Sequence, residues 1–285
     1  MSKILWLASY PKSGNTWLRA FLLNLLHNPS VPFDINKMSS FSPVDSDAVW
    51  YRRLDPRSPT ELSEGDLARL RPKVHALLAE MAADIALVKT HNAHVEVDGQ
   101  PMITQSLTAG AIYIVRNPLD VAVSYAYHVD RPVEEVIAEL ASVGHSTSAK
   151  ESNVPELRCD WSTHVESWTG RPHPGFHVVR YEDMSRRPGP TFRAIARFLG
   201  LKTPRERIDR AIRHASFRTL RAQEERSGFI ESSSRQQRFF RAGKVDGWRR
   251  VLDDAQVRRV VDRHRAQMER FGYVPDDYRS EPKGA

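Results

Sequence analysis

Residues 4–17 read ILWLASYPKSGNTW, and this stretch decides the fold. The apolar run Ile4 to Ala8 predicts a short buried strand of the kind found in parallel sheets. After Gly14, the leucine-rich segment Thr16 to His27 contains no glycine or proline and predicts a helix, and two prolines shortly after it predict its end. A strand, a tight glycine turn and a helix, in this order, are the opening of a nucleotide-binding α/β domain.

The turn is suited to binding a phosphate. Gly14 permits a tight turn, and the first amides of the following helix point outward, where the helix dipole favours an anion. Lys12 adds a positive charge, and Ser13 and Thr16 add hydroxyl donors. The usual P-loop spacing is absent, because the lysine precedes the glycine and no hydroxyl stands where it would hold magnesium. Taken alone, the turn is equally consistent with a polar cap that has no ligand.

Further apolar runs predict the rest of an α/β domain with a parallel sheet. Strands are predicted over Asp84–Val88, Ala111–Val115 and Phe176–Val179. Helices are predicted over Glu64–Ala82, from Asn117-Pro118 onward, and over Trp161–Trp168, Thr191–Leu199 and Ala255–Phe271. No internal repeat or clear linker divides the chain, so we expect a single domain over residues 1–285. The polar, serine- and arginine-containing stretch at about 221–240 predicts a flexible loop.

Composition limits the class of protein. Among 285 residues, 42 are Lys or Arg and 35 are Asp or Glu, which gives a net charge of +7 and favours anionic partners. Cys159 is the only cysteine, so no intramolecular disulfide can form and a reducing, cytoplasmic location is expected. No segment approaches the ~20 apolar residues of a membrane span, and Ile4 to Ala8 is too short for a signal-peptide core.

Two of the predicted strands end in residues that carry chemistry. In an open α/β sheet, ligands bind outside the carboxyl ends of the strands. Lys89 and His91 follow the second strand, and a histidine there can act as a general base near neutral pH. Arg116 follows the third strand and is suited to pairing with a phosphate, while Ser124 lies one turn after Asp120 on the next helix. The alternatives are a strand-end histidine without a function and an arginine that neutralises Asp120.

These segments together resemble a known family. SYPKSGNTW at residues 9–17 resembles the 5'-phosphosulfate loop of sulfotransferases that use 3'-phosphoadenosine 5'-phosphosulfate (PAPS). Cytosolic animal members usually have threonine at the position of Asn15, and the asparagine form is similar to bacterial members, including those that sulfate glycopeptide antibiotics. The Lys-Thr-His triplet ending at His91 and the segment Arg116 to Ser124 are also similar to the family. The resemblance covers roughly Ile4 to Trp248.

The resemblance implies a three-layer fold with a central parallel sheet, P-loop-like in its nucleotide binding, and a role for each matching residue. It implies that His91 takes the proton from the acceptor hydroxyl, that Lys12 stabilises the leaving group, and that Lys89 assists. It implies that the nucleotide is bound by Lys12, Ser13, Gly14, Asn15, Thr16, Trp17, Arg116, Ser124, Tyr181, Phe217, Arg241 and Gly243.

Three departures from the family pattern affect the nucleotide side. Ala242 stands where the family often has lysine, Asp246-Gly247-Trp248 stands where the family has Gly-Asp-Trp, and Ala215 stands where threonine is common. Because the dimerisation motif of many animal members is not recognisable near the end of the chain, no oligomeric state is predicted.

The expected activity is in-line transfer of a sulfuryl group from PAPS to a hydroxyl of a small-molecule or natural-product acceptor. The product would be 3'-phosphoadenosine 5'-phosphate (PAP), and no metal or nucleic-acid partner is expected. A P-loop-type small-molecule kinase is the main alternative, and a nucleic-acid-binding module and an inactive nucleotide binder are two others.

The acceptor itself is not determined by the sequence. Residues 28–80, 128–155 and 221–240 are expected to shape its pocket, and several aromatic side chains suggest an acceptor with an apolar portion. These aromatic residues are Phe33, Phe41, Trp50 and Tyr51. Tyr125, Tyr127 and His128 either line this pocket or are half-buried on their helix, whereas Trp161, His164 and Trp168 are expected to pack in the core.

Overall fold

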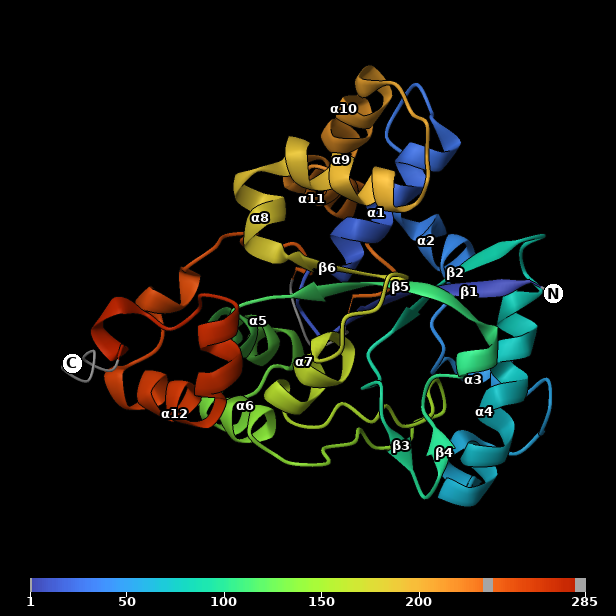
Figure 1. The fold of residues 1–285 in the computed structure, drawn as a ribbon, viewed down its shortest axis with the longest axis horizontal. Helices are drawn as coiled ribbons and strands as arrows, with labels where there is room; N and C mark the ends of the chain where they lie inside the picture. The colour runs from blue at the N-terminus through green and yellow to red at the C-terminus, as the bar shows by residue number, and fades with distance from the viewer. Residues whose placement is uncertain (1, 233–237, 280–285) are drawn as a thin grey trace.

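A four-stranded parallel sheet forms the centre of the computed structural model, which describes residues 2–232 and 238–279. Its strands are β1 (Lys3–Ser9), β2 (Ile85–Thr90), β5 (Thr108–Val115) and β6 (Phe176–Arg180). They pair in the order β2-β1-β5-β6, with all three pairs parallel (Figure 1). The four predicted strands and the parallel sheet are therefore confirmed.

Helices cover both faces of this sheet, so the predicted three-layer α/β class is also confirmed (Figure 1). One face carries α1 (Asn15–His27), α8 (Tyr181–Arg186), α9 (Pro188–Phe198), α10 (Arg205–His214) and α11 (Phe217–Ser227). The other carries α4 (Glu64–Ala79), α5 (Pro118–Val129), α6 (Val133–Leu140), α7 (Trp161–Thr169) and α12 (Asp254–Arg270). The shorter elements are α2 (Met38–Phe41), α3 (Ala48–Tyr51), the hairpin β3 (Glu96–Val97) and β4 (Gln100–Pro101), and the 3-10 turns Ile35–Lys37, Pro59–Glu61, Gln105–Leu107, Gly247–Arg250 and Asp276–Tyr278.

Strand β1 shows why its sequence is continuously apolar. Side chains alternate along a strand, and Ile4 and Trp6 pack into the core beneath α4 and α5. Leu5 and Leu7 pack into the core on the opposite face, under α1 and α9. A strand buried on both faces needs apolar residues at every position, and this burial brings the turn after Ser9 to the carboxyl edge of the sheet.

The predicted loop at 221–240 is wrong for residues 221–227, which belong to α11. Ser216 caps this helix by accepting a hydrogen bond from the amide of Thr219, and Leu220 and Gln223 are buried on its inner side. The arginine and glutamine residues on which the loop prediction partly rested are good helix formers. Residues 228–232 and 238–246 contain no helix or strand, and 233–237 lie outside the described residues.

Other differences concern short or terminal segments. The segment from residue 28 to 63, for which no helix was predicted above, contains two four-residue helices, α2 and α3. Helix α6 was not predicted, although Val136, Ile137 and Leu140 form a buried face on it. Within the described part of the chain, no helix combines the length and the apolar character needed to cross a membrane.

Candidate functional site

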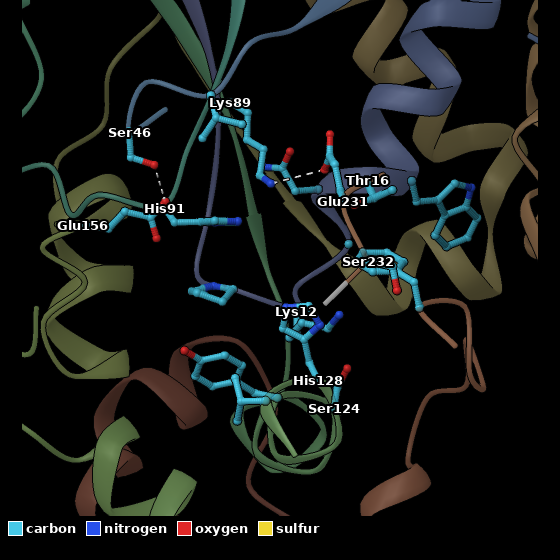
Figure 2. Close-up of a pocket in the computed structure, with 18 of the residues that line it drawn as sticks. Lys12, Thr16, Ser46, Lys89, His91, Ser124, His128, Glu156, Glu231 and Ser232 are labelled. Carbon is cyan, nitrogen blue, oxygen red and sulfur yellow. Dashed lines mark hydrogen bonds and ion pairs between the residues drawn. The ribbon is translucent and has the colours of Figure 1, made fainter. Parts of the chain in front are cut away.

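A large cleft opens at the carboxyl ends of the parallel strands. Its volume is about 2070 Å³, and the predicted site residues line it, except Ser13, which is buried beneath the turn. Figure 2 shows side chains from the ends of β1 and β2, from α5 and from the segment around Glu231 meeting at this cavity. The structure therefore brings together residues that are more than 200 positions apart in the sequence.

The glycine turn after β1 has the shape of an anion cradle. Gly14 has φ +106°, and a Cβ there would lie 2.7 Å from the ring of Tyr181, so a larger residue fits neither the backbone nor the space. The Asn15 side chain donates to the carbonyl of Leu7 at 2.8 Å and to Ser9 Oγ at 3.2 Å, which ties the turn to β1. Helix α1 begins at Asn15, so the amides of its first turn face the cleft floor.

Lys12 is held in an unusual state within this turn. Its Nζ lies 4.1 Å from the centre of the Phe239 ring, a cation–π contact from the distant segment after α11. Desolvation lowers the Lys12 pKa to about 7, with Arg116 and Lys89 contributing in the same direction. Lys12, Arg116 and Lys89 thus lie close enough to repel one another, and an anion bound among them would favour the charged form of Lys12.

Arg116 joins the turn to the C-terminal part of the chain. Its terminal nitrogens donate to the carbonyls of Lys12 at 2.7 Å and of Lys244 at 3.3 Å, and its guanidinium lies 4.2 Å from the Tyr181 ring centre. A guanidinium has five N–H donors, so three remain, including Nε, which has no partner in the described structure. The alternative role of Arg116 is only partly met: the described residues show no Arg116–Asp120 ion pair, and Asp120 accepts from the amides of Asp246 and Trp248 at 2.9 and 3.0 Å, but the charge of Arg116 still acts to lower the Asp120 pKa against the effect of burial.

Aromatic rings form the side of the cleft next to Arg116. The Trp17 and Tyr181 rings meet edge to face with centres 5.9 Å apart, and Trp17 Nε1 is buried without a partner in the described residues. Gly243 has φ +59°, and a Cβ there would overlap the ring of Phe217, so only glycine permits this approach. Arg241 lies over the Tyr127 ring at 4.8 Å, and Ser124 lines the cleft one turn before His128 (Figure 2).

His91 has a fixed ring orientation. Its Nδ1 lies 2.7 Å from the carbonyl oxygen of Ser9, which can only accept, so Nδ1 carries the hydrogen and Nε2 is the unprotonated nitrogen. Desolvation and then the charge of Lys89 lower the His91 pKa to about 3, so the ring is neutral at physiological pH. His164, which was predicted to pack in the core, is buried. Its Nε2 lies 3.2 Å from the backbone carbonyl oxygen of His91.

Glu231 is a site residue that the sequence did not indicate. Its carboxylate lies 3.5 Å from Lys89 Nζ and 2.8 Å from the fully buried guanidinium of Arg19, and it accepts from Ser39 Oγ at 3.0 Å. These cations lower the Glu231 pKa to about 2, against the effect of burial. No local signal could have revealed it, because it lies in the stretch predicted to be a flexible loop.

A second unpredicted carboxylate, Glu156, lies beside His91. It accepts from Ser46 Oγ at 2.9 Å (Figure 2). It also forms an ion pair with Arg158 at 2.6 Å. Arg158 also contacts the hydroxyl of Tyr125. Tyr125 lines the cleft, which is one of the two positions predicted for it. Arg158 and His91 keep the Glu156 pKa low, at about 2, so a negative charge stands beside the imidazole.

Only some of the aromatic side chains considered for the acceptor pocket line the cleft. Trp50, Tyr127 and His128 line the cleft, whereas Phe33, Phe41 and Tyr51 do not. Phe33 and Phe41 instead contact the ring of His27, and Tyr51 is buried in the core. In the ranges 2–232 and 238–279, no group of three or more histidine, cysteine or acidic residues is arranged to hold a metal ion.

Comparison with known proteins agrees with this geometry. A family model described as the sulfotransferase domain matches residues 2–272. A flavonol 3-sulfotransferase from Flaveria bidentis is 26% identical over 90% of this chain and 78% of its own length. Sulfotransferase 1A1 from Canis lupus familiaris is 27% identical, and the matched region covers 76% of this chain and 65% of the dog enzyme.

Solved structures show the same fold at lower identity. Retinol dehydratase in complex with retinol and PAP superposes with a TM-score of 0.63 at 20% identity, covering 93% of this chain and 81% of that one. A mouse sulfotransferase complexed with PAP gives a TM-score of 0.59 at 21% identity, covering 93% and 84%.

Proposed function

The chain belongs to the sulfotransferase domain family, and from this membership we propose that it transfers a sulfuryl group from PAPS to a hydroxyl of an organic acceptor. The observation that carries the proposal is the meeting of three features in one cleft. These are the glycine turn with Lys12, the N–H donors of Arg116 that remain available for hydrogen bonding, and the unprotonated Nε2 of His91. A neutral base facing a cluster of cations suits transfer between an anionic donor and a hydroxyl group.

The residues of the cleft fit the nucleotide. Trp17 Nε1 and Arg116 Nε are buried polar groups of the cleft that lack partners in the described structure, as expected where a polar ligand binds. We propose that the turn amides, Lys12 and Thr16 hold the phosphosulfate. The 3'-phosphate would be held by Arg116, Ser124, Arg241 and Gly243, and the adenine by Trp17, Tyr181 and Phe217. PAP is bound in the solved retinol dehydratase and mouse sulfotransferase complexes.

The chemistry then follows from the states of the side chains. PAPS supplies a sulfuryl group, which the acceptor oxygen accepts while the sulfur–oxygen bond to the 5'-phosphate breaks. Nε2 of His91 takes the hydroxyl proton, and Glu156 stabilises the imidazolium that forms. Lys12 in its charged form stabilises the negative charge that grows on the departing oxygen, and Lys89 helps to orient the transferred group. The residues need no metal for these roles.

We also propose a cellular setting. The Asn15 form of the turn supports a bacterial-type member, and the single cysteine, a buried free thiol, supports a reducing cytoplasm. Residues 1–285 would act as a single domain.

The first test is the melting temperature of the purified protein with PAP, with ADP, and with ATP plus magnesium. We expect PAP alone to raise it, because a ligand at a hundredfold excess over its Kd stabilises the folded state by ~2.7 kcal/mol. A shift only with ATP and magnesium would favour the kinase alternative. The absence of a shift with all three ligands would remove the nucleotide from the proposal.

Arg116→Gln is expected to weaken PAP binding by about 1.5–3 kcal/mol, the contribution of a hydrogen bond to a charged group. Calorimetric titration with PAP and with adenosine 5'-phosphosulfate, which lacks the 3'-phosphate, measures the effect. The variant should lose affinity for PAP and little for the second ligand. Equal losses for both ligands would mean that Arg116 only supports the turn through Lys12 and does not bind the 3'-phosphate.

A further inference from the structure

One wall of the cleft near His91 consists of two chain segments that are joined by backbone hydrogen bonds. It is formed by residues 46–53, which include α3, and by residues 147–154. Backbone hydrogen bonds join the two segments: the Val154 amide donates to the Ser46 carbonyl, and the Ala48 amide donates to the Ser152 carbonyl, both at 2.9 Å. Asp47 and Asn153 form an antiparallel bridge between them. The wall is therefore a defined surface on which an acceptor can be recognised.

This wall is continuous with the catalytic residues. Ser46, at its inner end, donates to Glu156 beside His91 (Figure 2). The wall therefore begins next to the proposed base, within the same cleft.

The chemistry of the wall is polar. Short hydroxyl and amide side chains line it, namely Ser46, Thr147, Ser148, Ser152 and Asn153. One large aromatic residue, Trp50, stands among them. Many short hydrogen-bonding groups around one indole ring suit a hydroxyl-rich molecule better than a wholly apolar one.

The lip of the wall carries more positive than negative charge, with Arg52, Arg53 and Lys150 against Asp47 and Glu151. Arg52 is paired with Glu151 at 2.9 Å, and Asp47 caps α3 by accepting from the amide of Val49. Arg53 lies 4.5 Å from the Trp50 ring centre, and in the described residues neither it nor Lys150 has a carboxylate within ion-pair distance. Both are exposed and both line the cleft.

The two free cations have complementary geometries. The Arg53 guanidinium lies close to the Trp50 ring, which restricts its position, and its planar fork of N–H donors matches the geometry of a carboxylate. Lys150 presents a mobile point charge from the facing segment, next to the bridge that joins Lys150 to Asn153. We infer that the acceptor is a hydroxyl-rich molecule bearing a carboxylate, which binds at Arg53 and Lys150 while its hydroxyl reaches His91. This inference rests on the proposed function.

A matched pair of glycosides tests it. 4-Methylumbelliferyl β-D-glucuronide and β-D-glucoside share the aglycone and the ring hydroxyls, and they differ only by a carboxylate in place of a hydroxymethyl group. We expect the glucuronide to bind the PAP-saturated protein with a Kd about five- to tenfold lower, because two exposed ion pairs each contribute modestly. Raising the ionic strength should reduce the ratio.

Substitutions in the wall test whether Arg53 and Lys150 cause the difference in Kd between the two glycosides. Arg53→Gln and Lys150→Gln should each move the ratio of the two Kd values toward one, and because both side chains are exposed, the fold should be retained. Lys202→Gln, an exposed lysine outside the cleft lining, should leave the ratio unchanged. Equal affinities, no binding of either glycoside, or a ratio that neither variant changes would overturn the inference. If PAP still stabilised the protein in that case, the proposed function would stand; if PAP did not, the function itself would fail.

Discussion

Replacing His91 with alanine is expected to lower kcat by about 10²–10⁴-fold, the usual contribution of a general base. The expected loss follows from the ring's fixed orientation: Nδ1 is committed to the Ser9 carbonyl, and Nε2 is left unprotonated at the carboxyl end of β2. The Kd for PAP should be largely unchanged, because His91 is not among the residues proposed to bind the 3'-phosphate and the adenine, which gather around Arg116 and Trp17. Single-turnover kinetics and calorimetric titration with PAP separate the two effects.

A control for this substitution comes from another histidine. His173 is exposed and lies outside the cleft lining, so His173→Ala should retain full turnover. If His91→Ala also turned over near the rate of the unmodified protein, His91 would not be the base. If it lost PAP affinity to the same degree as activity, its role would be structural.

The parts of the site that could be predicted are those determined by local sequence. The apolar run of β1 with Gly14 after it, and the Lys-Thr-His triplet at the end of β2, each combine a local structural signal with a chemical one. Because parallel strands end at one edge of a sheet, identifying the strands was sufficient to predict that Lys12, His91 and Arg116 would meet.

The unpredicted parts depend on long-range packing. Glu231 reaches Lys89 only because the fully buried Arg19 on α1 draws its carboxylate inward. Glu156 stands beside His91 because residues 147–158 fold back along the segment at Ser46. Neither residue has a local pattern, since an acidic residue in a polar stretch is normally exposed.

The same physics explains the error at residues 221–227. Single-sequence polarity does not distinguish a solvated loop from a helix with one narrow buried face. The burial of Leu220 and Gln223 against the core around α1 determines which one forms.

Lys12→Ala is the second substitution with a large expected effect. It should lower kcat by about 10²–10³-fold, as when one preorganised donor to a developing negative charge is removed. It should also change how PAP binding depends on pH. The Lys12 pKa is about 7 in the free protein because of desolvation and the neighbouring Arg116 and Lys89, and an anionic ligand prefers the charged ammonium.

The sign of that dependence follows from linkage. Below pH 7 Lys12 is already protonated, so it adds no further pH dependence to PAP affinity, and the change that remains comes from the phosphates of PAP, whose second pKa is about 6. Above pH 7 binding requires uptake of a proton, so the Kd should rise by up to about tenfold per pH unit until the pKa in the complex is reached. In Lys12→Ala this part of the profile should disappear, whereas in Lys202→Ala it should persist.

His91, with a pKa of about 3, should add no ascending limb near pH 6.5 to kcat/KM for the donor. A pH profile that is the same with and without Lys12 would mean that its charge is not what the nucleotide contacts. Phe239, whose ring lies over the ammonium, would then hold Lys12 away from the ligand.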